Sequence, residues 1–230
     1  MLVLAVDTAT PAVTAGVVTL AETGPPRTLA TRVTRDAKAH GELLMPHVRD
    51  ALAEAGRRLA DLDAVVCGAG PGPFTGLRAG MVTAAALGQA LDRPVYPVVT
   101  LDAIALDALD ADPGDQPLLV ATDARRREVY WAAYDPAGRR LDGPHVQAPA
   151  EVAGRLAELG VTRAAGEGAR RYADVLGLPV LAPDHPTPAA LVAVAAADLR
   201  SGAQPGPLTP LYLRRPDAVE PGARKRVTRV

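Results

Sequence analysis

A glycine-rich segment, GAGPGPFTGLRAG at residues 68–80, is the part of this chain whose residue types and spacing best suit chemistry. It follows an apolar, strand-like run at residues 64–67 and leads into a helix-like run at residues 81–87. Glycine permits a positive φ and proline fixes φ while removing a donor, so this composition predicts a tight strand-to-helix loop. Such a loop points free backbone N–H groups at whatever lies above the helix N-terminus. It could cradle a phosphate, present a docking helix or simply connect two elements, and it matches neither the P-loop nor the dinucleotide-binding pattern.

Few other residues could act as catalysts or metal ligands. His40 and His47 are seven residues apart, which places them on one helix face but too far apart for one metal ion. Cys67 stands in an apolar strand-like run, where packing is a better interpretation than nucleophilic attack. The chain has no GxSxG pattern, and its only serine is Ser201. We therefore predict no catalytic residue and no metal site.

Composition restricts the class of protein. The chain has 230 residues, 48% hydrophobic and 22% charged, as expected of a soluble globular protein with one large or two small domains. Its formal net charge of −1 offers no global attraction to nucleic acid, although basic residues cluster at 125–127 and 224–226. One cysteine excludes an internal disulfide. No signal peptide and no apolar run of about 18–20 residues is visible, so we expect a cytoplasmic protein without membrane contact.

The elements that would position the glycine-rich loop form an α/β pattern that opens with a β-meander. Apolar runs predict strands at residues 2–6, 13–20, 29–33, 64–67 and 95–99. Apolar residues at spacings of three and four predict a helix over about 40–59, and small residues indicate a helix over 74–91. The order β-β-β-α-β-α-β is a meander followed by right-handed crossovers.

The second half is also predicted to be α/β, with weaker strands. Helix-like runs occupy residues 101–109, 150–159, 168–176 and 188–199, and strand-like runs occupy 118–122, 129–134, 161–165 and 178–181. We divide the chain into subdomains at 1–108 and 109–215, with a last helix at about 188–200 that could pack back on the first, and a flexible charged tail at 216–230. Two such halves fit the actin-like ATPase (ASKHA) architecture.

A nucleotide site of that architecture would use the turn after the first strand, where Asp7, Thr8 and Thr10 stand. Asp and Thr are also good turn formers, and we favour that plainer interpretation. The second phosphate loop should fall at residues 123–128 (DARRRE), which include no glycine and whose bulky side chains would obstruct a phosphate. A complete ATP clamp is therefore not predicted, and the GEGA segment at 166–169 is interpreted as an ordinary connection. A vestigial nucleotide site would comprise Asp7, Thr8, Gly70, Gly72 and Thr75.

Several segments resemble one protein family, in the order in which that family has them. Residues 70–80 (GPGPFTGLRAG) resemble the GPGSFTGLRIG segment of TsaB, a family of bacterial proteins needed for the threonylcarbamoyl modification of the adenosine next to the tRNA anticodon. The start of the chain (MLVLAVDTATPAVTAGVV) and residues 40–48, 100–105 and 123–135 are similar to other landmarks of the family, and residues 210–214 (PLYLR) resemble its C-terminal strand. Pro73 departs from the family's serine, which weakens the case for phosphate binding because a hydroxyl and an N–H are lost.

The resemblance implies the actin-like fold and a non-catalytic activator or scaffold subunit. Such a subunit would pair with the TsaD-type catalytic paralogue, be joined by a TsaE-type ATPase, form a homodimer when alone and meet tRNA only indirectly. It would need no cofactor, with nucleotide possible only in the complex. The family's paired surface is formed by two helices of the first domain, here those that begin at His40 and Phe74. The residues expected there are His40, Leu43, His47, Phe74, Leu77, Arg78, Met81, Ala84, Ala85 and Gly88.

Small residues in the helix at 74–91 would let another helix approach closely, and they would leave an apolar patch on the free protein. They are Ala79, Gly80, Ala84, Ala85 and Gly88. On this interpretation Gly80→Arg or Ala84→Arg should abolish pairing without unfolding the protein.

Two other functions stay open. An actin-like-fold enzyme, either a small-molecule kinase or a degenerate metallopeptidase, would bind ATP or metal tightly as the isolated chain, which a calorimetric titration with ATP and magnesium would detect. A tRNA-binding module acting through the arginine clusters would show steeply salt-dependent RNA binding on its own.

Overall fold

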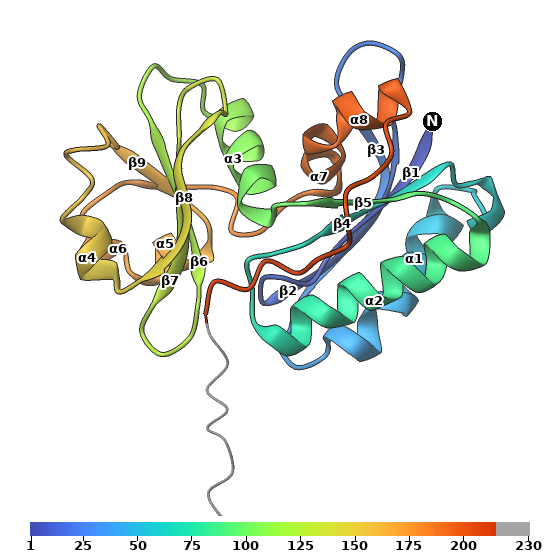
Figure 1. The fold of residues 1–230 in the computed structure, drawn as a ribbon, viewed down its shortest axis with the longest axis horizontal. Helices are drawn as coiled ribbons and strands as arrows, with labels where there is room; N and C mark the ends of the chain where they lie inside the picture. The colour runs from blue at the N-terminus through green and yellow to red at the C-terminus, as the bar shows by residue number, and fades with distance from the viewer. Residues whose placement is uncertain (215–230) are drawn as a thin grey trace, which may run out of the picture.

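The structure, a computed structural model, describes residues 1–214, which form two lobes, each built on a five-stranded sheet (Figure 1). The tail predicted at 216–230 lies outside the described residues. The first sheet has the strand order β3-β2-β1-β4-β5. Its strands are β1 (Leu2–Asp7), β2 (Ala12–Thr19), β3 (Arg27–Arg35), β4 (Ala64–Gly68) and β5 (Val95–Val98). The first three are antiparallel and form the predicted meander, whereas β4 and β5 continue the sheet in parallel with β1.

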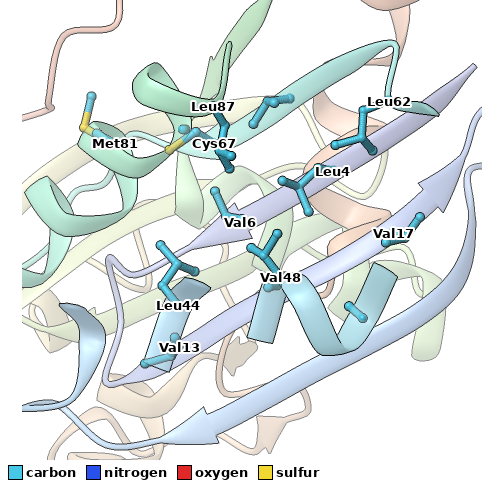
Figure 2. Close-up of a cluster of buried hydrophobic side chains, with 14 of the residues drawn as sticks. Leu4, Val6, Val13, Val17, Leu44, Val48, Leu62, Cys67, Met81 and Leu87 are labelled. Carbon is cyan, nitrogen blue, oxygen red and sulfur yellow. The ribbon is translucent and has the colours of Figure 1, made fainter. Parts of the chain in front are cut away.

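Helices cover both faces of the first sheet because successive side chains of a strand point to opposite faces. On one face lie α1 (His40–Glu54) and α2 (Phe74–Leu91); on the other lie α7 (Pro188–Val194) and α8 (Ala196–Ser201). Leu4 of β1 packs in the core formed with α1 and α2 (Figure 2). Its neighbour Val3 packs in the opposite core, with Leu191 of α7.

The second sheet repeats the strand order of the first. Its strands are β6 (Leu118–Asp123), β7 (Val129–Tyr134), β8 (Arg140–Gln147), β9 (Arg163–Ala165) and β10 (Val180–Leu181), in the order β10-β9-β6-β7-β8. Again the first three are antiparallel and the last two parallel. The short helices α4 (Pro149–Ala153), α5 (Glu167–Arg171) and α6 (Ala173–Leu176) cover one face. The helix α3 (Thr100–Ala111) covers the other.

The helix α3 and the C-terminal segment both make contacts with the two lobes. The helix α3 lies between the sheets (Figure 1), and its Asp107 carboxylate accepts two hydrogen bonds of 2.8 Å from Thr187, the residue before α7. Residues 207–214, here called the C-terminal strap, cross from the first lobe to the second. The Leu211 N–H donates to the Ala69 carbonyl at 2.9 Å, and Arg214 pairs with Glu128 beyond β6.

Five sequence predictions about elements are wrong in detail, and the first three concern helices. The helix predicted to reach residue 59 ends at Glu54, since Gly56 takes φ 62°, and Leu59–Asp61 forms a separate 3-10 turn. The helix predicted at 150–159 stops at Ala153 before Gly154, and the helix predicted at 188–199 divides at Ala195 into α7 and α8.

The other two errors concern strands. The strand β8 was not predicted, because its sequence is polar and contains a Gly-Pro pair that an edge strand tolerates. Residues 210–214 form no strand, since prolines at 207 and 210 remove backbone donors. No helix in the described part of the chain is both long and apolar enough to cross a membrane.

Candidate functional site

The polar side chains at the turn between β1 and β2 are buried in the protein interior. Asp7, at the end of β1, and Thr8 are both buried. The Asp7 carboxylate accepts a hydrogen bond of 2.7 Å from the Thr100 hydroxyl in α3. The Thr8 hydroxyl donates to the Gly76 carbonyl at 2.7 Å and accepts from the Gly80 N–H at 3.0 Å, both in α2. These two side chains therefore attach α3 and α2 to the hairpin.

The Asp7 carboxyl titrates far from its ordinary range. Burial raises its pKa to about 6, although hydrogen bonds from Thr100 and from the Ala9 N–H favour the charged form. Gly68 makes room for this carboxyl, because a Cβ at that position would overlap it. The geometry gives Asp7 a structural role, as a link between β1, β4 and α3.

The glycines of the loop allow its backbone to pack against the hairpin. A Cβ at Gly72 would overlap the Ala9 carbonyl, and a Cβ at Gly76 would lie 2.9 Å from the Thr8 carbonyl. Gly70 has φ 95°, a conformation that favours glycine. Of the five residues proposed for a vestigial nucleotide site, only Thr75 is exposed; the side chains of the others face the protein interior or are absent.

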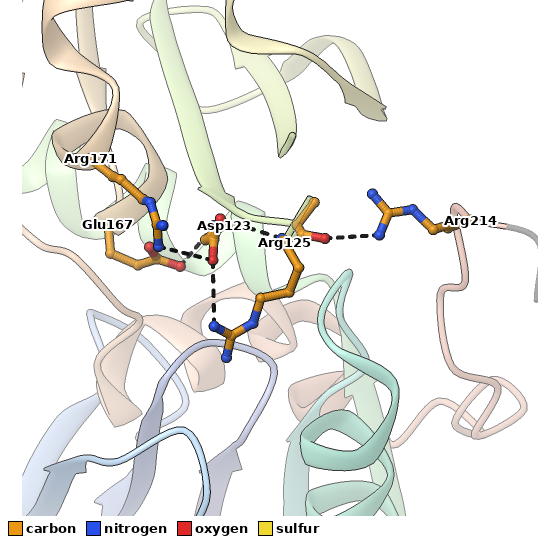
Figure 3. A network of polar contacts seen from close by, with 6 residues as sticks. Asp123, Arg125, Glu167, Arg171 and Arg214 are labelled. Carbon is orange, nitrogen blue, oxygen red and sulfur yellow. Dashed lines mark hydrogen bonds and ion pairs between the residues drawn. The ribbon is translucent and has the colours of Figure 1, made fainter. Parts of the chain in front are cut away.

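An arginine-rich turn occupies residues 125–127, where the second phosphate loop of an actin-like ATPase was expected from sequence. Arg125, Arg126 and Arg127 all have positive φ, of 62°, 54° and 62°. Left-handed conformations are costly for residues with a Cβ, and such strain concentrates at functional sites. Figure 3 shows Arg125 reaching from this turn toward the loops of the first lobe, with its guanidinium 3.9 Å from the Asp123 carboxylate.

A polar network supports the base of this turn (Figure 3). The Asp123 carboxylate lies 3.4 Å from the Arg171 guanidinium, and the Glu167 carboxylate accepts a 2.8 Å hydrogen bond from the Asp123 N–H. Burial raises the pKa of Glu167 to about 7. The network ties α5 to the end of β6 and thereby holds the arginine turn in place.

The two helical histidines have separate structural partners. The His40 Nε2 lies 2.9 Å from the Thr10 carbonyl, and the ring is buried against α2. The His47 Nε2 lies 2.9 Å from the Thr34 hydroxyl of β3. Within residues 1–214, no group of three or more His, Cys, Asp or Glu side chains is arranged to hold a metal ion.

We expect the Cys67 thiol to be unreactive in the native protein. Cys67 is fully buried in β4, and burial raises the pKa of its thiol far above the usual range. Labelling with 5,5′-dithiobis(2-nitrobenzoate) at pH 8 should proceed at most at about the rate of global unfolding and become immediate in guanidinium chloride. Fast labelling of the folded chain would show that the thiol is accessible.

One face of α2 exposes two large apolar side chains, and we call this face the α2 stripe. Phe74 is 54% exposed and Val82 is 66% exposed, and Arg78 and Ala85 lie exposed between and beyond them. The spacing of four, four and three residues keeps these side chains on one helix face. The predicted residues Leu43 and His47 of the adjacent α1 are half-buried.

Five of the ten residues expected at the partner surface are buried within the first lobe: His40, Leu77, Met81, Ala84 and Gly88. In this conformation a partner would have to contact the exposed and half-buried members of the set instead. Gly80 is buried as well, and a Cβ there would overlap the Thr8 hydroxyl. Gly80→Arg and Ala84→Arg should therefore disrupt the fold, contrary to the expectation from sequence.

Sequence reasoning missed Val82, the most exposed large apolar residue of α2. Its spacing of four residues from Arg78 and eight from Phe74 could have identified it, since positions i, i+4 and i+8 share a helix face. The prediction of the partner surface was based instead on small residues of the helix, most of which face inward.

Comparisons with known proteins identify relatives of this chain. The family model described as "TsaD: tRNA N6-adenosine threonylcarbamoyltransferase" matches residues 34–189. An uncharacterized protein of Mycobacterium tuberculosis is 54% identical over 216 residues, covering 94% of this chain and 93% of its own length. The tRNA threonylcarbamoyladenosine biosynthesis protein TsaB of Escherichia coli is 37% identical over 134 residues, covering 58% of this chain and 55% of its own length.

Solved structures agree with these matches. A 2-hydroxyisocaproyl-CoA dehydratase activator from Clostridium difficile, with ADPNP bound, has a TM-score of 0.52 at 13% identity, covering 88% of this chain and 97% of its own, and shares the fold alone. The fold class is that of actin-like (ASKHA) proteins, as predicted. A Pseudomonas aeruginosa protein with similarity to peptidase YeaZ has a TM-score of 0.74 at 32% identity, covering 93% of this chain and 99% of its own. The chain belongs to the TsaB/YeaZ family.

Proposed function

We propose that this chain takes part in threonylcarbamoyladenosine biosynthesis on tRNA, as a non-catalytic subunit that activates a TsaD-type catalytic paralogue. The names of its relatives support the pathway, and the match to the TsaD family model supports pairing between similar folds. A TsaE-type ATPase would join this pair, and two copies of the chain could pair through the same surface when the paralogue is absent.

The α2 stripe is the observation that carries this proposal. Two large apolar side chains, Phe74 and Val82, are more than half exposed on a helix whose opposite face is packed into the lobe. Exposed apolar patches of this kind mark interaction surfaces in soluble proteins. The exposed Ala85 further along the stripe would let a partner helix approach closely.

The interior of the first lobe favours an accessory role over an enzymatic one. An actin-like phosphotransferase needs polar groups of the first hairpin to face its nucleotide. Here Asp7 and Thr8 form their hydrogen bonds with α3 and α2, inside the protein. The second phosphate loop is replaced by three consecutive arginines.

Val82→Arg is expected to weaken binding to the TsaD-type paralogue by at least about 100-fold, because a buried, unpaired guanidinium at an interface costs several kcal/mol. The fold should be unaffected, since Val82 is 66% exposed. Leu141→Arg is the matched control: Leu141 is 52% exposed, but it lies on β8 of the other lobe. Size-exclusion chromatography and calorimetry would measure both. Equal binding by the wild type and Val82→Arg would exclude this surface.

Reconstitution tests the function itself. TsaD-type and TsaE-type proteins are mixed with tRNA and threonylcarbamoyl-adenylate, with and without this chain. Modification that requires the chain, together with no ATP hydrolysis and no tRNA modification by the chain alone, is the expected result. Turnover by the isolated chain would favour the actin-like-fold enzyme instead.

A further inference from the structure

A pocket of about 560 Å³ lies where the two lobes and the C-terminal strap meet. Its walls are the loop before α2, the first turn of α2, the arginine turn after β6, and strap residues 212–214. This volume is in the range of sites that enclose small ligands. The buried polar groups of the first hairpin, Asp7 and Thr8, do not line it.

Aromatic residues are concentrated in this pocket. The chain has one Phe, one Trp and five Tyr, and three of these seven, Phe74, Tyr130 and Tyr212, line it. The rings of Phe74 and Tyr212 stack with centroids 5.4 Å apart and an interplanar angle of 24°. Both rings remain exposed, at 54% and 40%. A planar heterocycle can therefore stack against them.

The charged side chains that line the pocket are all basic, although Arg214 pairs with Glu128 and Arg125 lies 3.9 Å from Asp123, both just outside the lining. Four arginines line it, Arg78, Arg125, Arg126 and Arg214, and no acidic residue does. This contrasts with the net charge of −1 of the whole chain. Arg78 is fixed beside the rings, with its Cζ 3.6 Å from the Phe74 centroid and its Nε donating to the Tyr212 hydroxyl at 2.5 Å. The pocket thus offers guanidinium groups next to an aromatic wall.

The arginine turn adds an independent argument. Its three left-handed residues carry side chains where glycine would be free of strain, and Gly would fit the same φ values. Strained backbone conformations of this kind cluster at ligand clamps and active sites. Arg125 and Arg126 from this turn face the pocket.

We propose that this pocket binds a nucleoside phosphate, with the base against Phe74 and Tyr212 and the phosphate on Arg125 and Arg126. The unit could be a free nucleotide or an unpaired residue of an RNA strand, and only the RNA source rests on the function proposed above. The chain's own residues 215–230 are unsuited as the occupant, since they contain five basic and two acidic residues. Like charges would oppose their entry.

Calorimetry on the full, isolated chain tests this at 50 mM salt. The probes are AMP, inorganic phosphate, a single-stranded RNA decamer and a phosphoserine peptide. Binding of AMP or RNA, more tightly than phosphate by at least about tenfold, is expected, because base stacking adds to the charge contact. Binding of both identifies a free nucleotide as sufficient; binding of RNA alone identifies a strand. Tightest binding of phosphate or of the peptide, or no binding at all, overturns the proposal.

Three variants place the ligand in the pocket. Tyr212→Leu should lose at least about fivefold in affinity, whereas Tyr212→Phe, which keeps the ring, should stay within about twofold. Arg126→Gly should also lose at least about fivefold in affinity, because it removes a guanidinium from the phosphate position. Glycine suits the left-handed backbone, so the variant should keep the wild-type circular dichroism spectrum and cooperative unfolding. An affinity loss that appears only together with loss of the fold would indicate a purely structural role for Arg126.

Arg139→Gly is the matched control for Arg126→Gly, since Arg139 is an exposed arginine in the β7–β8 turn, far from the pocket lining. Its affinity should equal that of the wild type. Nucleotide binding that is unchanged in Arg126→Gly and Tyr212→Leu would place the ligand elsewhere and overturn the assignment. These measurements need no partner protein, so they can be read whatever the outcome for Val82→Arg. Phe74 and Arg78 belong to both the α2 stripe and the pocket, so a partner on the stripe would share them with the ligand.

Discussion

Gly68→Ala is expected to destabilise the protein by about 3–5 kcal/mol, enough to abolish most of the stability of a typical domain. The new methyl group would overlap the Asp7 carboxylate and lie 2.9 Å from the Thr100 hydroxyl. All three groups are buried, so neither side chain can move away without breaking their 2.7 Å hydrogen bond. Overpacking and a lost buried hydrogen bond therefore add. Urea denaturation followed by circular dichroism would measure the loss.

A second substitution tests whether Gly68→Ala destabilises through its clash with Asp7 or because position 68 tolerates no alanine at all. Asp7→Ala removes the clashing carboxylate, so Gly68→Ala should cost much less in that background, and the double-mutant cycle should give a coupling energy of at least about 1 kcal/mol. Gly41→Ala is the control, because a Cβ there meets nothing within 4 Å in α1. It should be neutral or stabilising by up to about 1 kcal/mol. Additive effects of Gly68→Ala and Asp7→Ala would contradict the packing described.

Asp7→Asn is expected to increase stability at neutral pH relative to the wild type, by up to about 3 kcal/mol. Burial raises the pKa of Asp7 to about 6, from an ordinary value near 3.9 in the unfolded chain. A raised carboxyl pKa means that the folded state prefers the protonated form. This contribution to stability is complete below about pH 4 and is lost as pH rises through about 6. Asparagine stays neutral; its Oδ1 can accept from the Ala9 N–H, and its Nδ2 can donate to the Thr100 hydroxyl in place of the bond that Thr100 now donates.

Urea titrations of the wild type and Asp7→Asn at pH 4, 5, 6 and 7 would check this. The difference between the two free energies of unfolding should be small at pH 4 and grow toward pH 7. Contributions that are the same in both proteins cancel in this difference. They include those of Asp135 and Asp142, whose pKa values are lowered by hydrogen bonds and whose effect on stability has the opposite pH dependence. Glu167, with its pKa raised to about 7, should give the same trend in Glu167→Gln at slightly higher pH. A constant difference across the series would mean that Asp7 titrates normally in the folded state.

The strand–loop–helix unit at residues 64–91 was predictable from sequence because the residues that end the strand and begin the helix lie within the segment itself. Glycine and proline fix the loop, and the small-residue run continues the helix, so α2 was predicted with its observed bounds. The family and the fold class were predicted from the resemblance of several segments to TsaB, and the comparisons confirm both.

The orientation of α2 was not predictable, which is why five of the residues expected at the partner surface are buried in the free chain. Both faces of this helix carry small or apolar residues. Gly80 and Gly88 looked suited to a partner helix, but they serve the chain's own hairpin and β5, where a Cβ would overlap Thr8 and Val95. Close packing requires small residues whether the neighbour is internal or external. The arginine–aromatic pocket was missed for a different reason: its walls come from segments about 50 to 140 residues apart, which only the fold brings together.

The covering of the first sheet by α7 and α8 has a consequence for the order of events during synthesis. Until residues 188–201 have left the ribosome, the face of the sheet that carries Val3, Val18 and Val66 has no cover. One apolar face of the nascent first lobe therefore stays exposed while the whole second lobe is translated. A fragment that stops near residue 108 should aggregate or recruit a chaperone, so the boundary between the subdomains in sequence does not separate two independent folding units.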